Sequence, residues 1–432
     1  LSSVITNTTT LQHIWFNFTA CEIDQTGLEI LAKAIVKSRT KLKLTLTENN
    51  IGKFENIIIL TDAIQNGETP RGLYLDLSYN HIKTDDILKL AHAIQSGYAP
   101  QDLSLDLSGN SLSDADVIIL ANAIQSGKAP EGLNLILRVN NITVEGIRAL
   151  ANAVCSGKAP ANLHLDIASN NVNDAGATIL ANAIKGGCAP IGLHLNLSAN
   201  HIGPDGVVTL AGAIKSGNAP KIFKLNLNAN NIDNKGIEAL AKSIESGCAP
   251  YYLSLKLRGG NLIDEGILTL ANALKNDEAM CYLRDLQLDL SGNKIGEVGI
   301  NALEKALHSN IRVTKLSLDS VLTNQLNIIK HCCLRNRLIL QYPNLESFIK
   351  ELSYKANVYI PGKKPMRSLA FSLQSIVASS FLFEHYHIYK NNSHLIPEDL
   401  NEYISNLMII KEQLSINVAP ILNSSVSMQV KN

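Results

Sequence analysis

Two histidines and one aspartate are the residues whose types and spacing most readily suggest chemistry. His164 and His194 stand thirty residues apart, and Asp166 follows the first at a distance of two. If both histidines lie on adjacent parallel strands, their backbones are about 4.8 Å apart, and imidazole nitrogens at that spacing can share a zinc ion. The sequence places no third ligand beside them. We therefore predict no metal site and interpret the histidines as solvated or partner-contacting side chains.

The run His331-Cys332-Cys333 is the second candidate for chemistry, because a thiolate beside an imidazole can act as a nucleophile. The sequence places no acid and no second histidine next to this run. The apolar spacing from Leu326 to Leu340 favours a helix, so we interpret the cysteines as helix packing. The chain contains neither a glycine-rich phosphate loop nor a Cys-x-Asp motif. We predict no catalytic residue, no bound cofactor and no enzymatic activity.

The overall charge of the chain does not favour partners that bind through strong long-range electrostatic attraction. The 432 residues include 38 basic and 38 acidic side chains, so the formal net charge is zero. Such a balance does not favour binding to nucleic acid or to an anionic membrane. The longest uncharged apolar stretch near the C-terminus, residues 368–383, is shorter than the roughly 20 residues of a spanning helix. We therefore expect no nucleic acid partner and no membrane span.

The cysteines give an expectation about the compartment. There are seven of them, an odd number, and no two form a Cys-x-x-Cys pair. This usage is typical of reduced thiols rather than of a disulfide framework. The sequence therefore predicts a cytosolic environment with reduced cysteines.

The candidate residues belong to a unit that recurs every thirty positions from residue 73 to 257. One such unit, LSLDLSGNSLSDADVIILANAIQSGKAP, begins at Leu103. Leucines at every second position predict a strand with one buried face. Apolar spacings of three and four then predict a helix that includes Val117 and Ile124. The helix ends at Ser-Gly-x-Ala-Pro, because Gly127 can adopt a left-handed conformation and proline cannot continue a helix.

One asparagine in each unit follows the strand and is a candidate for a structural rather than a binding role. A buried amide at this place can bond backbone groups of its own turn and of the neighbouring turn. Gly260 stands where the next asparagine is expected, and the interval from there to Asn293 is 33 residues rather than thirty. The sequence therefore predicts a local distortion near Arg258. The asparagines of the regular units are Asn80, Asn110, Asn140, Asn170, Asn200 and Asn230.

The pattern LxLxLSxNxIxxxGxxxLAxAIxSGxAP resembles the leucine-rich repeat in its ribonuclease-inhibitor-like subtype, from about Leu11 to Val321. This resemblance implies an α/β solenoid of about ten to eleven repeats in residues 1–321, the terminal ones degenerate. Its horseshoe has parallel strands on the concave side and helices on the convex side. Curvature also follows from spacing, because paired strands lie about 4.8 Å apart and packed helices roughly 8 to 10 Å. The rhythm stops in residues 322–432, which we expect to form a mostly helical cap or small domain.

The residues between the strand leucines point away from the core, so they predict the binding face. Aromatic and arginine side chains are enriched among the residues that anchor protein interfaces. The alternative is a solvated concave face with no single dedicated partner. The candidate partner-binding residues are Trp15, Tyr74, Asp76, Tyr79, Asp106, Asn134, Arg138, His164, Asp166, His194, Lys224, Lys256 and Arg258.

The near-identical LDLSxNxI and LANAIxSGxAP units resemble those of effector proteins that intracellular bacterial pathogens deliver into host cells. This resemblance implies a non-enzymatic scaffold, monomeric when free, that binds a host protein or another effector. The competing interpretation joins a substrate-selecting repeat module to an enzymatic or ubiquitin-ligase-adaptor C-terminal region. The segment that begins LIPEDLNEYI at Leu395 faintly resembles the start of an F-box, which would make the chain such an adaptor.

Overall fold

The computed structural model describes residues 13–53, 57–276, 282–310 and 312–319, together with 329–330, 332–333 and 336–337. The chain divides into two units, Leu1–Leu340 and Gln341–Asn432, and all described residues belong to the first. The F-box-like segment and most of the expected helical tail therefore lie outside the described residues. The expected boundary at residue 321 stays a prediction.

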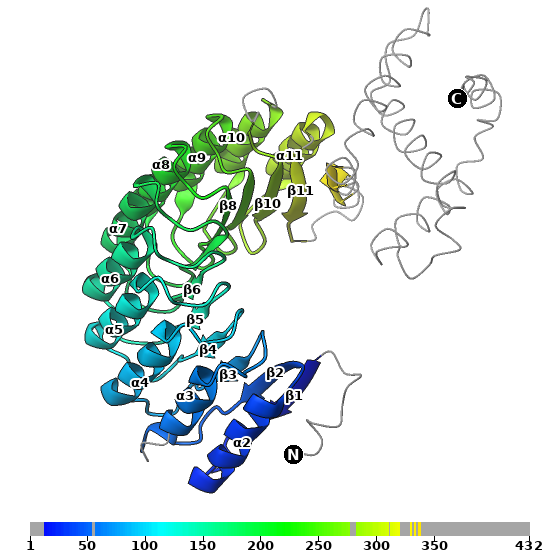
Figure 1. Ribbon diagram of the computed structural model, residues 1–432. Helices are drawn as coiled ribbons and strands as arrows, with labels where there is room; N and C mark the ends of the chain where they lie inside the picture. Colours follow the sequence, from blue (N-terminus) through cyan, green and yellow to red (C-terminus); the bar gives the residue numbers. More distant parts are fainter. Residues whose placement is uncertain are drawn as a thin grey trace, which may run out of the picture. The chain divides into compact units, whose positions relative to one another are not determined.

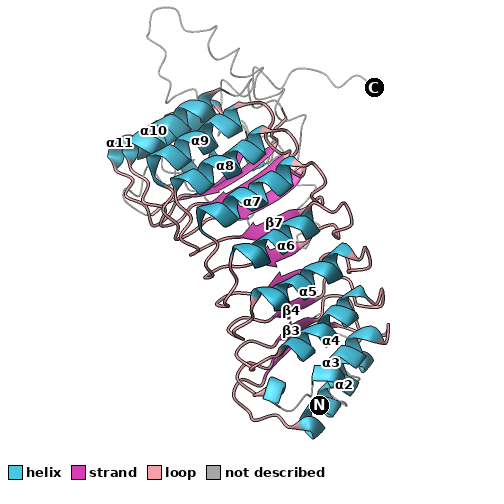
Figure 2. Ribbon diagram, turned by 90° about the vertical axis from the view of Figure 1, so that its left-hand side faces the viewer, coloured by secondary structure: helices cyan, strands magenta, loops and turns pink. Residues whose placement is uncertain are grey.

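Strands and helices alternate along the first unit and form an open α/β solenoid (Figure 1). Eleven strands pair in parallel, each with its neighbours in the sequence, in the order β1 to β11. The sheet lines one side of the row and the helices line the other, as Figure 2 also shows. This arrangement confirms the expected solenoid of parallel strands and helices. The strands are β1 (His13–Asn17), β2 (Lys41–Thr45), β3 (Tyr74–Asp76), β4 (Ser104–Asp106), β5 (Asn134–Ile136), β6 (His164–Asp166), β7 (Leu193–Asn196), β8 (Ile222–Asn226), β9 (Tyr252–Lys256), β10 (Asp285–Asp289) and β11 (Val313–Ser317).

Each helix packs against the helices of the adjacent repeats and closes the apolar side of the sheet. The apolar helix residues that recur at spacings of three and four residues, such as Val117 and Ile124, are fully buried between sheet and helices. No described helix is long and apolar enough to cross a bilayer. The helices are α2 (Gln25–Lys37), α3 (Ile57–Gln65), α4 (Thr84–Gln95), α5 (Asp114–Gln125), α6 (Val144–Val154), α7 (Asn173–Lys185), α8 (Pro204–Lys215), α9 (Asp233–Glu245), α10 (Asp264–Lys275) and α11 (Glu297–Ser309), with a short 3-10 turn η1 (Ile51–Lys53).

The asparagine of each regular unit lies in the turn behind the strand and connects three repeats. The Asn170 Nδ2 donates to the carbonyls of Leu137 and Ile167 at 3.0 and 3.1 Å. Its Oδ1 accepts from the backbone N of Asn140 at 3.1 Å, and its own backbone N donates to Asn200 Oδ1 at 2.9 Å. The same contacts recur from Asn80 onwards, so the predicted structural role is confirmed. We call this series the asparagine ladder.

Gly260 interrupts the asparagine ladder without disturbing the sheet. The distortion expected near Arg258 is wrong, because β9 pairs with β10 in unbroken register. The three additional residues instead lie in the connection between Lys275 and Asp285. The register shifts only one strand later, between β10 and β11, at Leu286.

Three aspartates at the starts of helices cap the helix of the following repeat. Asp174, in the first turn of α7, accepts from the backbone N of Gly203 and of Gly206 at 2.6 and 3.0 Å. Asp114 and Asp264 do the same for α6 and α11. A carboxylate at a helix N-terminus satisfies otherwise unpaired N–H groups and suits the positive end of the helix dipole. These contacts tie each capped helix to its predecessor.

The change Gly206→Ala will lower the free energy of unfolding by about 1 kcal/mol or more, because the site is already filled. A Cβ at Gly206 would lie 2.5 Å from Asp174 Oδ1 and 2.8 Å from Ile202 Cγ2. Gly212, on the same helix α8, is the matched control. A Cβ there would meet only the flexible end of Lys185 at 3.4 Å, so Gly212→Ala should stabilise by about 0.5 to 1 kcal/mol. Denaturant unfolding measures both, and equal changes of the same sign would contradict this account.

The described residues that follow β11 cover the C-terminal end of the solenoid. Ile329 and Cys332 are fully buried, and the Asn336 side chain donates to the carbonyls of Asn310 and Val313 at 3.0 and 2.8 Å. These two carbonyls belong to the end of the last described helix and the start of the last strand. An apolar edge that would otherwise face water is thereby covered, which is the role of a terminal cap in a repeat protein.

Candidate partner-binding face

The strand register places the predicted surface residues in two rows across the sheet. The first row pairs Trp15 with Lys43 and Tyr74 and continues through Asn134 and His164. The second row begins at Asn17 and runs two residues further along each strand. Both rows are aligned as the sequence predicted. The remaining members of the first row are Ser104, His194, Lys224, Ser254, Gln287 and Lys315, and those of the second are Thr45, Asp76, Asp106, Ile136, Asp166, Asn196, Asn226, Lys256, Asp289 and Ser317.

An aromatic pair with a lysine between its rings occupies the N-terminal end of the first row. The Lys43 Nζ lies 4.9 Å from the centre of the Trp15 ring and 4.6 Å from that of Tyr74. The Trp15 Nε1 donates to Thr45 Oγ1 at 3.2 Å, yet 64 % of the residue remains exposed. Cation–π contacts hold both rings upright over the sheet. We call Trp15, Lys43 and Tyr74 the aromatic cluster; the sequence had not marked Lys43 as a site residue.

Two aspartates of the second row flank the aromatic cluster. The Tyr74 hydroxyl donates to Asp106 Oδ2 at 3.3 Å, and burial, followed by the charges of both aspartates, raises the pKa of Tyr74. Burial also raises the pKa of Asp106, which accepts from Ser108 Oγ at 2.5 Å. Asp76 makes the corresponding contact with Ser78 at 2.6 Å. This end of the face therefore combines aromatic surface with negative charge.

Tyr79 lies beyond the strand, in the turn that follows the second row. It is 48 % exposed and has a left-handed backbone, with φ of 54°. Its ring covers the neighbouring turn so closely that a Cβ on Gly109 would lie 2.3 Å from it. Tyr79 thus adds a second exposed aromatic surface beside the aromatic cluster.

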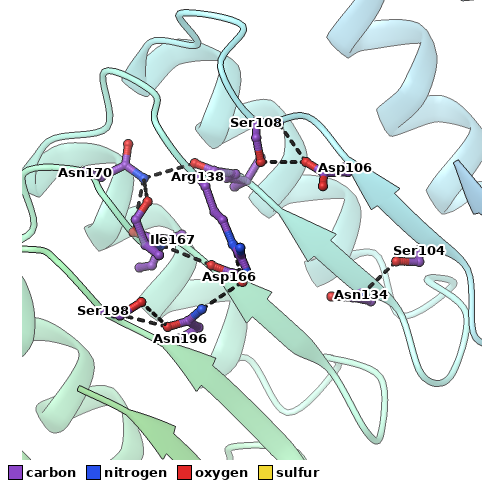
Figure 3. A network of polar contacts seen from close by, with 12 residues as sticks. Ser104, Asp106, Ser108, Asn134, Arg138, Asp166, Ile167, Asn170, Asn196 and Ser198 are labelled. Carbon is purple, nitrogen blue, oxygen red and sulfur yellow. Dashed lines mark hydrogen bonds and ion pairs between the residues drawn. The ribbon is translucent and has the colours of Figure 1, made fainter. Parts of the chain in front are cut away.

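A buried aspartate joins three strands in the middle of the face (Figure 3). Asp166 is 1 % exposed, and its Oδ2 accepts from Arg138 Nη2 at 2.6 Å and from Asn196 Nδ2 at 2.8 Å. The hydrogen bond to the carboxylate raises the pKa of the Arg138 guanidinium. Partner contact through Asp166 stays a prediction, but its carboxylate already serves to fix Arg138 on the surface.

The rings of the two histidines stack on each other. The rings of His164 and His194 lie 3.9 Å apart and nearly parallel, at 6°. Burial lowers the pKa of His164 to about 4, and burial together with its neighbour lowers the pKa of His194 to about 3. Both rings are therefore neutral near pH 7. No group of three metal-ligating side chains occurs among the residues that the structure describes.

Asn134 precedes the histidine pair in the first row. Its Nδ2 donates to Ser104 Oγ at 2.7 Å. Its Oδ1 and the Nε2 of His164 are buried, and neither has a hydrogen-bond partner among the described residues. Two such groups in neighbouring positions are polar atoms that the described fold buries without pairing.

Three cations follow the histidines on β8, β9 and the next turn. Lys224, Lys256 and Arg258 are exposed. The Lys224 Nζ lies 5.9 Å from the ring centre of Tyr252. No ion pair joins these cations to an acidic side chain within the described ranges. The candidate residues thus form three groups along the sheet. One is aromatic and acidic, the central one contains the Arg138–Asp166 ion pair and the stacked histidines, and the third is basic.

The cysteine run of the tail does not present an exposed nucleophile. Cys332 and Cys333 are buried, in agreement with helix packing, and His331 lies outside the described residues. Cys21, Cys155, Cys188 and Cys248 are free thiols and each belongs to a different repeat.

The family described as Leucine Rich repeat matches residues 162–181, 193–211, 220–241 and 283–303. Each matched segment begins at or next to a strand and ends within the helix that follows it. Four strand–helix units of the solenoid therefore match leucine-rich repeats. Repeats of this kind stack into extended concave surfaces and act as protein–protein interaction modules.

Similar solved structures were also found. No curated protein matched the sequence. Actin-binding site 2 of leiomodin-1 is 18% identical, with a TM-score of 0.28, covering 34% of this chain and 80% of that one. The tropomodulin C-terminal domain of Caenorhabditis elegans is 14% identical, with a TM-score of 0.28, covering 35% and 88%. The yeast complex of Rad7 and Elc1 gives 16% identity, a TM-score of 0.36 and coverage of 72% and 81%.

Proposed function

We propose that the protein is a non-enzymatic scaffold that binds a protein partner through the concave face of its leucine-rich repeats. The observation that carries this proposal is Trp15, a large ring left 64 % exposed in the first row and held in place by Lys43 and Thr45. An exposed aromatic side chain that is already ordered gives up little rotamer entropy on binding. The aromatic cluster is therefore suited to anchor a partner.

The charges around the aromatic cluster indicate which surface it would meet. Asp76 and Asp106 lie in the second row beside Tyr74, and both raise the pKa of that tyrosine. A basic surface would be attracted to this end of the face. Charges of this kind act mainly on the rate of association.

The proposed partner is a host protein or another effector, and the proposed setting is the cytosol of a host cell. Support comes from the resemblance of the LDLSxNxI and LANAIxSGxAP units to those of effectors delivered by intracellular bacterial pathogens. Reduced thiols at Cys21, Cys155, Cys188 and Cys248 are compatible with that setting.

Capture of partners from a host lysate and from a lysate of the producing organism tests this proposal. The protein, its Trp15→Ala variant and its Asn122→Ala variant are used side by side as bait. Asn122 is exposed on α5, on the side of the helices, and serves as the control. A partner retained by the parent and by Asn122→Ala, but not by Trp15→Ala, supports the concave face. A partner lost only with helix-side changes would refute it.

Tyr74→Ala should weaken binding of that partner by at least about 1 kcal/mol, through faster dissociation. The change removes a ring that is half-buried under Lys43 and bonded to Asp106. Asp76→Asn should instead slow association at low salt and leave dissociation nearly unchanged. Asparagine can keep the contact with Ser78, because Asn196 makes the same contact with Ser198 at 2.8 Å. Surface plasmon resonance at two salt concentrations separates the two effects, and parent-like kinetics for Tyr74→Ala would contradict the anchor.

A further inference from the structure

The basic end of the concave face has a composition that the aromatic anchor does not explain. Lys224 continues the row of His164 and His194 by direct strand pairing. Lys256 pairs with the residue two places after Lys224, on the adjacent strand, and Arg258 follows it in the next turn. These five side chains therefore form one continuous strip over four neighbouring strands, which we call the basic strip.

The cations of the basic strip form no ion pair with a described acidic side chain, although Asp289 is the strand neighbour of Lys256. Arg138 shows the contrast, since its guanidinium is bound by the carboxylate of Asp166 at 2.6 Å. Lys224, Lys256 and Arg258 have no such ion pair among the described residues. Exposed cations of one sign on adjacent strands repel one another, so a set of unpaired charges favours an anion that lies across them.

The pKa values of the two histidines also reflect the positive charges of the neighbouring lysines. Burial is the main cause of their low pKa values, and the charges of Lys224 and Lys256 lower both further. Other ionisable groups act on the pair as well: Asp166 raises both pKa values, and Arg138 lowers that of His164. The balance leaves two neutral rings at this end of the strip, so they add no charge to that of the lysines.

We propose that the basic strip binds an acidic segment of the protein partner, with carboxylates that pair with Lys224, Lys256 and Arg258. This inference rests on the proposed concave-face function and specifies the chemistry of a second part of the partner. The same face then binds a basic surface near Trp15 and an acidic segment near Lys256. Such opposite charges at the two ends would fix the direction in which the partner lies.

Separate carboxylates fit this strip better than a continuous phosphate backbone does. In the second row, Lys256 lies next to Asp289, and Asp166 is located three strands away on the other side. A polyphosphate crossing the whole face would pass over both aspartates. A protein segment can place its carboxylates on the three cations alone. The chain also carries no net positive charge to attract nucleic acid.

The test uses a fluorescent peptide of alternating glutamate and glycine, with a lysine–glycine peptide and a single-stranded DNA of equal length for comparison. Binding anisotropy at low salt is measured for the parent and for Lys224→Glu/Lys256→Glu. The control, Lys215→Glu/Lys305→Glu, has the same net charge but changes exposed positions on the helices α8 and α11. Circular dichroism verifies that both double variants keep the fold, as expected for exposed side chains.

The expected result is that the parent binds the glutamate peptide, that the strip variant binds it at least about tenfold more weakly, and that the control is unchanged. Equal losses in both double variants would overturn the proposal, because net charge alone would then explain binding. Tighter binding of the DNA than of the peptide, with the same dependence on Lys224 and Lys256, would assign the strip to nucleic acid and overturn it too. A captured partner that depends on Tyr74 but tolerates the strip variant would reject the acidic segment and leave the concave-face function standing.

Discussion

Asn170→Ala will lower the free energy of unfolding by about 1 to 3 kcal/mol, because it leaves several buried backbone groups without partners. The lost contacts are the donations to Leu137 and Ile167 and the bond accepted from Asn140. These groups belong to two neighbouring repeats, so the change also weakens the interface between them. Urea unfolding followed by circular dichroism measures the effect as a shift of the midpoint.

Asn122→Ala is the matched control, since it removes the same amide from an exposed position on a helix. It should be neutral or slightly stabilising, because alanine has the higher helix propensity. Ser198 is less suitable as a control. Its hydroxyl donates to Asn196 Oδ1 at 2.8 Å, so its removal is not without cost. Equal midpoints for Asn170→Ala and Asn122→Ala would disprove the structural role of the asparagine ladder.

The stability of the parent will fall as the pH is lowered from about 6.5, and a variant with His164→Gln and His194→Gln will lose less. In the folded protein the pKa values of the two histidines are lowered to about 4 and about 3. In the unfolded chain they titrate near 6.5, so below that pH the unfolded state binds more protons. The stability that depends on neutral histidines is therefore complete above about pH 6.5 and declines down to about pH 4.

Between about pH 6.5 and 4.5 the free energy of unfolding of the parent should fall by about 1 to 3 kcal/mol more than that of the double variant. Urea titrations at several pH values give this difference directly, and the aspartates common to both proteins cancel. A control variant with His13→Gln and His92→Gln changes two exposed histidines and should decline like the parent. If the His164/His194 variant and the His13/His92 variant lost the same free energy of unfolding, the two stacked histidines would not be buried and neutral in the folded protein.

Much of the fold could be predicted because one spacing is repeated so often. The alternation from Leu103 and the helical spacing from Val117 fix which faces are buried, and thirty-residue periodicity then fixes the register. The same reasoning aligned Trp15 with Tyr74 and His164 with His194 before any geometry was known. Only local errors followed, such as the distortion expected at Arg258.

Contacts between side chains of different repeats could not be predicted in the same way. Lys43 was not a candidate because its position between Trp15 and Tyr74 depends on two side-chain conformations on neighbouring strands. Asp166 was expected on the surface, yet Arg138 and Asn196 cover it. The aspartates that cap the following helix were also missed, because a cap is usually sought in the sequence just before its own helix. In each case the periodic pattern gives the backbone position but not the partner.

The gap that Gly260 leaves in the asparagine ladder has a mechanical consequence. In the regular turns each asparagine accepts bonds from the preceding repeat, as Asn230 does from Asn200, whereas at residue 260 this acceptor is missing and the Ile232 side chain fills its place. Side-chain bonds specific to this junction between β8 and β9 stand in for the missing one, from Arg258 N to Asn228 Oδ1 at 2.9 Å and from Asn261 Nδ2 to Asn231 Oδ1 at 3.1 Å. Lys224 and Lys256 stand on opposite sides of it. A ligand that bridges them would add a further tie across this junction, so the bound protein should resist stretching there more than the free protein does.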